Sequence, residues 1–384
     1  MSLLLLLSLL ALTAVVVSSV TFAVGLNKMR KLADVSISDA CPLISIIVPA
    51  CNEEKNISRS VLSLLAQEYE NLEIIVVNDR STDTTSQVLG DIQRRYSGLI
   101  VHEIDTLPKG WMGKSHALSV GAALATGEYL VFTDADVVMA PTTIGRSLAY
   151  MVDKQLDHLT LIFKNMTRGW LLNSLILDSA IGLMVIFKPW LAHQKGTRWY
   201  IGIGAFNMVR RAAYNAVGGH ESFKMHPVDD MMLGRTIKEH HYSQDCLLAY
   251  DFVAVPWYDS VGEMIKGLEK NMFSLVHYRV VLLPFALLAI IIPSIWPLWG
   301  AIFGPADVQA VCLVTVIIRL LSFYQGLWRQ GLPGWYLPGC LVTPYISCYI
   351  IIKSAFVTLK NGGISWRGQH YPLAELRKTT PFFF

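Results

Sequence analysis

Charge is scarce in this chain of 384 residues. Charged residues make up 16% of the sequence and hydrophobic residues 53%, whereas a typical soluble domain is about a quarter charged. The net charge is only +3, and no long basic run with interleaved aromatic residues occurs, which argues against a nucleic-acid partner. The sequence also lacks internal repeats and low-complexity linkers. This composition favours a chain that is partly embedded in a membrane.

Paired cysteines are also missing. The chain has six cysteines, and none of them form a C-x-x-C pair. Neither a zinc site nor a disulfide framework is therefore indicated. The cysteines are scattered along the chain, at Cys41, Cys51, Cys246, Cys312, Cys340 and Cys348.

The N-terminal stretch contains no charged side chain from Met1 to Asn27, and about 20 apolar residues suffice to span a bilayer. Lys28, Arg30 and Lys31 follow at once, which predicts an outside N-terminus and a cytoplasmic continuation. A cleaved signal peptide would have a basic start and a shorter apolar core. We therefore predict an uncleaved transmembrane anchor over residues 1–27.

Further apolar segments lie in the C-terminal part, over residues 280–357. Val280–Gly304, Val308–Trp328 and Trp335–Val357 are each long enough to span. If all three cross, the basic tail over 358–384 lies outside, against the positive-inside rule. Several prolines make the first segment a candidate for a broken or re-entrant helix, so the side of the tail stays open. These prolines are Pro284, Pro293 and Pro297.

The stretch Trp170–Leu191 is apolar but contains Asp178 and Lys188. A core helix and an interfacial helix resting on the membrane are equally compatible with this pattern.

The middle of the chain alternates buried strands with helices. Residues 42–54, 72–83 and 128–137 are apolar runs rich in β-branched residues, each ending in polar side chains. Residues 56–69 and 113–127 have helical spacing, and Gly127 ends the second helix. This order predicts an α/β sheet with right-handed crossovers.

Polar side chains gather where these strands end: Asn52 and Glu53, then Asp79, then Asp134 and Asp136. Open α/β sheets bind ligands at this edge, although any single Asp there is more often a turn residue. The D-x-D pair of Asp134 and Asp136 cannot stay ionised cheaply without a partner. Mg²⁺ or Mn²⁺, which keeps positions free for phosphate and water, is the partner we predict.

Three motifs resemble family 2 glycosyltransferases of the GT-A fold: "VPACNEE", "VVNDRSTDTT" and "GKSHALSVGAALATGEYLVFTDADV". The resemblance covers residues 43–273 and implies a Rossmann-like nucleotide-sugar domain. By this resemblance Asp136 and Asp134 hold the metal, and Asp134 also contacts the ribose. Lys114 lies in the third motif and would face the donor. The resemblance assigns the nucleotide base to Pro49, Ala50, Asn52, Glu53 and Asp79.

An acidic pair, Asp229 and Asp230, begins the stretch "DDMMLGRTIKEH". Acids at a helix N-terminus stabilise its dipole, which is the structural alternative. The pair also resembles the Glu-Asp pair of the family, whose second acid is the base, so the resemblance assigns that role to Asp230. His220 is predicted to be a structural histidine in a loop. Lys109 is predicted to be a solvated charge on a loop.

The C-terminal motifs reduce the number of acceptor classes to consider. The Q-x-x-R-W motif of polymerising family members is replaced by "GLEKNMFS", which argues against a processive polysaccharide synthase. The tail "GGISWRGQHYPLAEL" is similar to hopanoid- and carotenoid-pathway glycosyltransferases, and the layout of apolar segments to ceramide glucosyltransferases.

The sequence therefore predicts an inverting, metal-dependent glycosyltransferase with one N-terminal and about three C-terminal transmembrane segments. It would use a nucleotide sugar, first of all a UDP-sugar, and transfer the sugar to a hydroxyl of a hopanoid, carotenoid or sphingolipid. The catalytic domain would face the cytoplasm from a multi-pass position in the cell membrane. The alternatives are a polyprenyl-phosphate glycosyltransferase, a processive synthase and an inactive membrane scaffold.

Overall fold

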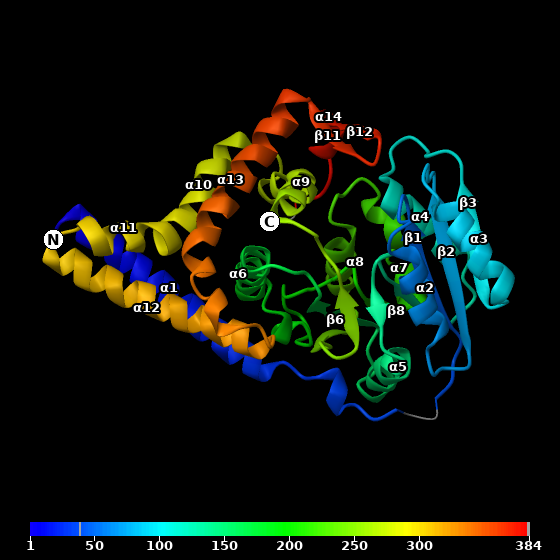
Figure 1. Cartoon of the computed structure of the whole chain (residues 1–384). Coiled ribbons are helices and arrows are strands. Elements are labelled where there is room, and N and C mark those ends of the chain that lie inside the picture. The colour runs from blue at the N-terminus through cyan, green and yellow to red at the C-terminus, as the bar shows by residue number, and fades with distance from the viewer. Residues whose placement is uncertain (38–39, 382–384) are drawn as a thin grey trace. The chain divides into compact units, whose positions relative to one another are not determined.

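A computed structural model describes residues 1–37 and 40–381 and divides into two compact units (Figure 1). The sheet unit comprises Met29–Met166 and Pro189–Trp257. The helical unit comprises Met1–Lys28, Thr167–Lys188 and Tyr258–Phe384. The helical unit thus takes its residues from both ends of the chain and from one insertion in the middle.

The sheet unit is built on a seven-stranded sheet with the order β3-β2-β1-β4-β8-β6-β9. All neighbouring strands run parallel except β8, which is antiparallel to both β4 and β6. A second sheet has the order β5-β10-β7. The strands are β1 (Ile44–Ala50), β2 (Leu72–Asp79), β3 (Leu99–Ile104), β4 (Tyr129–Phe132), β5 (Val138–Met139), β6 (His158–Ile162), β7 (Lys164–Asn165), β8 (Asn207–Arg210), β9 (Gln244–Leu248) and β10 (Val253–Val255).

Alternate residues of the central strands face two separate cores. On β1, Ile46 and Val48 pack into one core and Ile47 into the other, as the two-residue period of a strand requires. Both faces are covered, which explains why β1 and β2 are apolar along nearly their whole length. The first core is covered by α2 (Ile57–Leu65), α3 (Thr85–Arg95) and α5 (Thr143–Asp153), and the second by α4 (Gly113–Leu124), α7 (Arg211–Ala216) and α8 (Asp229–Glu239).

Helix α4 packs so closely on the sheet that one position must be glycine. A Cβ atom at Gly121 would collide with the side chain of Ile47 on β1. The alanine-rich sequence of α4 therefore serves close packing. This approach fixes the N-terminal end of α4, which carries Lys114, against the carboxyl ends of the strands.

The described residues contain five helices long and apolar enough to cross a membrane. Their ranges are Leu3–Lys28, Trp170–Leu191, Val280–Phe303, Ala306–Arg329 and Gly339–Lys360. The helical unit consists of α1 (Leu3–Lys28), α6 (Trp170–Phe187), α9 (Val261–Met272), α10 (Leu283–Ile290), α11 (Trp296–Phe303), α12 (Ala306–Arg329), α13 (Gly339–Lys360), the strands β11 (Gly363–Trp366) and β12 (Gln369–Pro372), and α14 (Leu373–Leu376).

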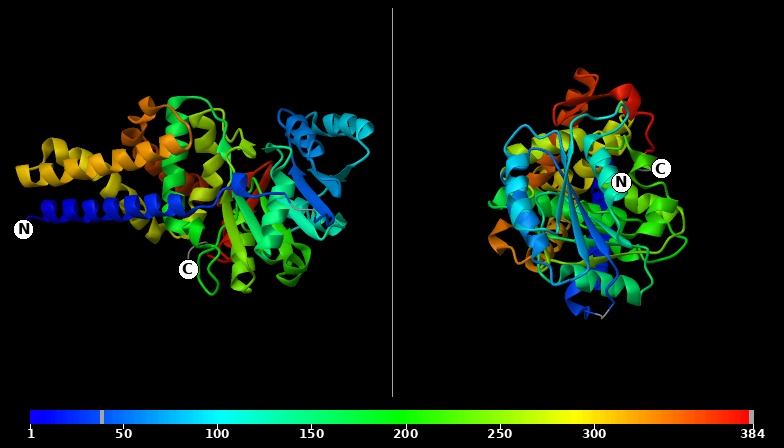
Figure 2. Two further views of the ribbon diagram at one scale, coloured as in Figure 1. Left: turned by 90° about the horizontal axis from the view of Figure 1, so that it is seen from below. Right: turned by 90° about the vertical axis from the view of Figure 1, so that its right-hand side faces the viewer.

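Helices α1 and α12 lie side by side and run in the same direction (Figure 2). Near their first turns, the Cys312 thiol donates to Ser8 Oγ at 3.3 Å. At their other ends, Arg329 donates to Asn27 Oδ1. The start of α12 therefore lies on the same side of the bundle as the N-terminus.

The segment expected to be broken or re-entrant stays helical over Val280–Phe303, but its α-helical pattern is interrupted. A π-helical segment, Ile291–Ile295, separates α10 from α11. Pro293 lies within it and Pro297 follows. Proline has no N–H to donate, so each one leaves a carbonyl of the preceding turn without its helical partner. The interruption follows from the proline spacing.

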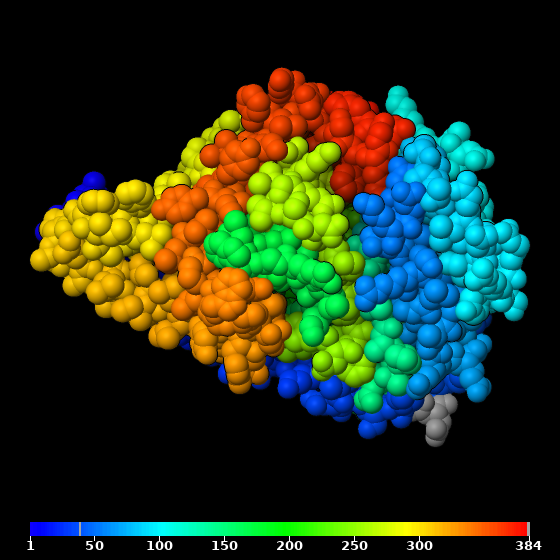
Figure 3. Space-filling view, in the orientation of Figure 1, coloured from blue at the N-terminus to red at the C-terminus, as the bar shows by residue number. Residues whose placement is uncertain are grey.

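The C-terminal tail folds back onto the segment that precedes α10. Lys353 on α13 pairs with Glu269 on α9 at 2.6 Å, and the Phe273 N–H donates to Ser354 Oγ at 3.0 Å. The Arg377 guanidinium donates to the Tyr278 carbonyl at 3.1 Å. In Figure 3 the red C-terminal hairpin continues the surface of the orange α13. The tail and the start of α10 therefore lie at the same end of this unit.

Helix α6 cannot be a simple membrane crossing, although its length and composition would allow one. It lies in the sequence between β6 and β8, and these strands pair in one sheet. No further candidate spanning helix occurs between residues 189 and 279 of the described chain to bring it back. Both ends of α6 must therefore lie on one side of any bilayer.

Candidate active site

The candidate site forms at one edge of the seven-stranded sheet. Strands β1, β2 and β4 are parallel and adjacent, so their carboxyl ends meet at the same edge. Asn52, Asp79 and Asp134 lie at or just after these three ends, as the sequence predicts. Residues that are 82 positions apart in the chain are thereby brought to one edge.

The loops after β1 and β2 are joined by hydrogen bonds. Asn52 Oδ1 accepts from the Thr82 N–H at 2.7 Å, and the Asn52 N–H donates to Ser81 Oγ at 2.9 Å. The Glu53 N–H donates to Thr85 Oγ1 at 2.8 Å. Asn52 adopts a left-handed backbone with φ of 56°, which asparagine tolerates better than most residues. The side chain of Asn52 thus shapes the loops at this edge.

Asp79 ends β2 and is buried, with 3% of its surface exposed. Arg80 holds both of its oxygens, from Nε to Oδ1 at 2.7 Å and from Nη2 to Oδ2 at 2.8 Å. A Cβ atom at Gly113 would lie 2.6 Å from Asp79 Oδ2 and 2.8 Å from Arg80 Nη2. The start of α4 therefore closes over a neutral ion pair.

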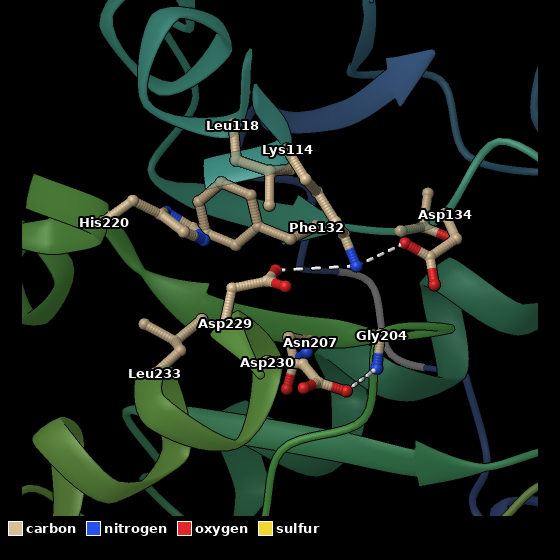
Figure 4. Close-up of a pocket in the computed structure, with 11 residues that line it drawn as sticks. Lys114, Leu118, Phe132, Asp134, Gly204, Asn207, His220, Asp229, Asp230 and Leu233 are labelled. Carbon is tan, nitrogen blue, oxygen red and sulfur yellow. Dashed lines mark hydrogen bonds and ion pairs between the residues drawn. The ribbon is translucent and has the colours of Figure 1, made fainter. Parts of the chain in front are cut away.

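A pocket lies next to this pair, and its polar centre is Lys114 on α4 (Figure 4). Lys114 Nζ lies 2.7 Å from Asp134 Oδ1 and 3.5 Å from Asp229 Oδ2. Burial alone would lower the pKa of Lys114, but the charges of Asp134, Asp229 and Asp230 outweigh it and raise that pKa. The lysine is therefore a permanent cation that joins the D-x-D motif to the acidic pair.

Asp230, in the first turn of α8, is held by two backbone groups. The Gly204 N–H donates to Asp230 Oδ2 at 2.7 Å, and the Met231 N–H donates to Oδ1 at 2.8 Å. Burial and the charge of Asp229 raise the pKa of Asp230 to about 6, against the opposing effect of Lys114. This carboxylate is ionised at neutral pH and is a better proton acceptor than an ordinary aspartate.

Asp136 lies among other carboxylates. Burial, followed by the charges of Asp134 and Glu53, raises the pKa of Asp136 to about 7. Such a set of hard oxygen ligands fits Mg²⁺ or Mn²⁺. Within residues 1–37 and 40–381, no three His, Cys, Asp or Glu side chains are arranged to enclose a metal ion. Any metal here would thus take further ligands from the substrate and water.

We expected two residues, His220 and Lys109, to play no part in the chemistry, and the structure shows what surrounds each of them. His220 lines the pocket, but it is buried and its Nδ1 lies 2.9 Å from the Tyr214 hydroxyl. Burial, together with the charge of Lys114, lowers the pKa of His220 to about 3, so it is a weak base. Lys109 is exposed on the loop before α4.

Sequence reasoning missed Gly204. A Cβ atom there would lie 2.6 Å from Asp134 Oδ2 and 3.4 Å from Asp230 Oδ2, so the glycine separates the two carboxylates. Its carbonyl also accepts from the Asp134 N–H at 3.1 Å. The sequence shows Gly202 and Gly204 as a G-x-G pair, but it does not show that a Cβ atom at Gly202 would collide with the Asp230 carbonyl.

Comparison with known proteins agrees with this geometry. The family "Glycosyl transferase family 2" matches residues 45–218. An uncharacterized glycosyltransferase of Haemophilus influenzae is 36% identical over 121 residues, which are 31% of this chain and 35% of that protein, so the match spans about a third of the relative. The 4,4'-diaponeurosporenoate glycosyltransferase of Staphylococcus aureus is 24% identical over 362 residues, covering 91% of this chain and 93% of the relative.

A solved structure shares the fold along most of the chain. The mannosyltransferase PcManGT from Pyrobaculum calidifontis, in complex with GDP-Man and Mn²⁺, has a TM-score of 0.59 and 18% identity. The similarity covers 89% of this chain and 99% of that one. The fold is therefore GT-A, as the sequence motifs predicted. The family model matches part of this sheet unit, and the two relatives named above are described as glycosyltransferases.

Proposed function

We propose that this glycosyltransferase moves a sugar from a nucleotide-diphosphate donor to a hydroxyl of a membrane lipid, with inversion and with a divalent metal. The observation that carries the proposal is the pocket in which Lys114 joins Asp134 to the acidic pair of α8. The residues that would bind the donor and the residues that would act on the acceptor in one displacement reaction therefore lie only a few ångströms apart. The sugar of the donor would lie between them.

The donor would be held at the edge of the sheet. Asp136 and Asp134 would hold Mg²⁺ or Mn²⁺, which as a Lewis acid would stabilise the charge that develops on the departing diphosphate. Lys114 adds a second fixed positive charge there. The nucleotide, a uridine diphosphate in our first hypothesis, would lie against Pro49, Ala50, Asn52, Glu53 and Asp79.

The acceptor hydroxyl would lose its proton to Asp230. Its two backbone hydrogen bonds fix the carboxylate in one orientation, and its raised pKa makes it a suitable general base near neutral pH. Asp229 would position Lys114 rather than react, because it is buried and lies 3.5 Å from the lysine nitrogen.

The acceptor class follows from the apolar helices of the chain. An enzyme that carries these helices meets acceptors that partition into the bilayer. A hopanoid, a carotenoid or a sphingolipid hydroxyl would fit. The name of the S. aureus relative, 4,4'-diaponeurosporenoate glycosyltransferase, supports a carotenoid-like acceptor.

The same name favours a second candidate reaction, because "-oate" denotes a carboxylate. A carboxylate acceptor, like a polyprenyl phosphate, is already ionised and needs no strong base. Transfer would then continue when Asp230 is replaced by Asn. A processive synthase would yield a ladder of products instead of one sugar per lipid, and an inactive scaffold would bind no donor.

We propose a multi-pass position in the cell membrane with the sheet unit on the cytoplasmic side. Lys28, Arg30 and Lys31 follow α1 directly, as expected for its cytoplasmic end. The tail packs beside the start of α10. We therefore propose that the tail lies on the same side of the membrane as the start of α10. Cys41 is the exposed cysteine in the described chain, so in sealed vesicles of known orientation an impermeant maleimide should label it only from the cytoplasmic face.

The first test is transfer by the full chain in detergent. A panel of nucleotide sugars would be supplied with Mn²⁺ or Mg²⁺ and total membrane lipid, and lipid-soluble product would be measured for wild type, Asp136→Ala and Asp230→Asn. Asp153→Asn, an exposed acid on α5, is the matched control. We expect product from wild type and the control only. If no nucleotide sugar binds even with metal, the enzymatic proposal fails.

A further inference from the structure

Three buried polar side chains lie on neighbouring strands of the seven-stranded sheet. His158 begins β6, Asn207 begins β8 and Gln244 begins β9, and β6 pairs with both of the other strands. No more than 2% of the surface of any of the three residues is exposed. A buried polar group is costly unless it is hydrogen-bonded, so the partners of these side chains indicate what the three residues do.

Backbone groups fix the direction of each hydrogen bond among these residues. The Ile203 N–H donates to Asn207 Oδ1 at 3.3 Å, so His158 Nε2, which lies 3.1 Å from the same oxygen, must carry a proton. The Ile201 N–H donates to Gln244 Oε1 at 3.0 Å, so the amide nitrogen of Gln244 donates to His158 Nδ1 at 2.7 Å. His158 is therefore neutral, in agreement with its burial, which lowers its pKa to about 4.

The three side chains hold the loop of residues 201–204, which precedes β8 and is called loop 201–204 below. Asn207 binds both backbone groups of Ile203, because its Nδ2 also donates to the Ile203 carbonyl at 2.8 Å. Gln244 accepts from the N–H of the first residue of the loop. His158 lies between Asn207 and Gln244 and joins them. Side chains from outside the loop therefore fix its backbone.

Loop 201–204 also packs against α8 without space for a side chain. A Cβ atom at Gly202 would lie 1.8 Å from the Asp230 carbonyl oxygen, and one at Gly234 would lie 2.0 Å from a carbonyl oxygen of the loop. Gln244 joins the loop to α8, because its Nε2 also donates to the Gly234 carbonyl at 3.1 Å. The loop therefore has little freedom to move while Gln244 keeps these bonds.

The last residue of the loop contacts both halves of the candidate site (Figure 4). The Gly204 N–H donates to Asp230 Oδ2 at 2.7 Å, and its carbonyl accepts from the Asp134 N–H at 3.1 Å. A displacement of loop 201–204 would therefore move the carboxylate of Asp230 relative to the D-x-D motif. A misplacement of about 1 Å in an active site can cost about 10²-fold in rate.

We propose that His158, Asn207 and Gln244 are positioning residues for the transfer reaction, because they fix loop 201–204 and thereby the orientation of Asp230. This inference rests on the proposed role of Asp230 as the base. Asn207 also lines the pocket, whereas His158 and Gln244 act through Asn207 and the loop. Substitutions at His158 and Gln244 therefore change no group that would touch the substrate.

The first part of the test measures transfer by the full chain in detergent. His158→Phe keeps a planar ring but removes both hydrogen bonds of the histidine. We expect kcat for a hydroxyl acceptor to fall about tenfold or more, while the affinity and KM of the donor change little. Gln244→Met should act in the same way. His158→Gln, whose amide can still donate to Asn207, should recover part of the rate.

Thr160→Val is the matched control. Thr160 is also fully buried and lies two residues further along β6, but its hydroxyl donates to the Phe206 carbonyl at 2.8 Å and not to loop 201–204. This variant should keep a kcat close to that of wild type. An equal fall of kcat in Thr160→Val and His158→Phe would overturn the proposal.

A double-mutant cycle separates positioning from a loss of folded protein. In the Asp230→Asn background, His158→Phe should lower the residual rate by no more than about twofold, because the group that it positions is already absent. A substitution that only reduced the fraction of folded protein would lower the rate equally in both backgrounds. Equal falls, or an unchanged kcat in His158→Phe, would contradict the proposal.

Hydrogen exchange on protein without donor tests the loop independently of sugar transfer. In His158→Phe and Gln244→Met, peptides that contain loop 201–204 should exchange about tenfold faster or more, while peptides from β1 and β2 should exchange as in wild type. Unchanged exchange would overturn the inference whatever the activity. Faster exchange together with wild-type transfer by Asp230→Asn would support the hold on the loop and show that the proposed base is wrong.

Discussion

Replacing Asp230 by Asn tests the proposed base most directly. A positioned general base contributes about 10²- to 10⁴-fold to a rate, which corresponds to about 3 to 5 kcal/mol of transition-state stabilisation. Asn keeps the shape of the side chain, and its Oδ1 can still accept from the Gly204 N–H. We therefore expect kcat for a hydroxyl acceptor to fall by at least 10²-fold, while the KM of the donor changes little.

The pH dependence of the transfer rate is a second test of the Asp230→Asn substitution. With a pKa of about 6 for Asp230, the ionised fraction falls about tenfold between pH 7 and pH 5, and wild-type kcat/KM should fall with it. In the Asp230→Asn variant, kcat/KM should no longer fall in this way as the pH is lowered. The assay is initial-rate transfer with saturating metal at each pH.

Stability distinguishes lost chemistry from lost folding. The folded pKa of Asp230 lies above the ordinary value of 3.8, so this group favours the folded state at low pH and less so as the pH rises through about 6. The Asn variant loses this dependence and one hydrogen bond, worth about 1 kcal/mol. A variant that folds, binds donor and still transfers to a hydroxyl at the wild-type rate would refute the assignment of the base.

Three further substitutions address the rest of the site. Asp136→Asn should raise the Mn²⁺ concentration for half-maximal activity at least tenfold, and an unchanged metal titration would contradict the metal assignment. Lys114→Met leaves Asp134 and Asp229 without their cation, so nucleotide affinity by calorimetry should fall at least tenfold and the melting temperature should drop. Gly204→Ala places a methyl group 2.6 Å from Asp134 Oδ2; activity should fall at least tenfold while circular dichroism stays unchanged, and full activity would show that the close approach is unimportant.

The sequence predicted the edge of the sheet well, because each part of that edge has a local signal. Strands β1, β2 and β4 are continuous apolar runs, and the polar residues after them mark where they end. The irregular stretch in the segment Val280–Phe303 was also predictable, since the missing N–H of Pro293 acts within one turn. These features depend on neighbours in the sequence.

Features set by distant contacts could not be predicted in the same way. The role of Gly204 depends on Asp134 and Asp230, which lie 70 and 26 positions away. Asp178 has no neighbour in sequence that suggests Arg319 as its partner, 141 positions later. The composition of α6 allows a core or an interfacial position, and it does not show the pairing of β6 with β8, which argues against a single membrane crossing.

Counting formal charges around the pocket explains why the donor should require a cation. Lys114 pairs with Asp134 and Asp229 and is also affected by the charge of Asp230, and the charges of Asp134 and Glu53 act on Asp136. Arg80 cannot contribute to this balance, because it is already paired with Asp79 through both carboxylate oxygens. One lysine thus opposes five carboxylates, and a diphosphate would add further negative charge. Nucleotide affinity should therefore depend on the divalent metal itself and not on catalysis alone, so a non-hydrolysable donor should bind only when the metal is present.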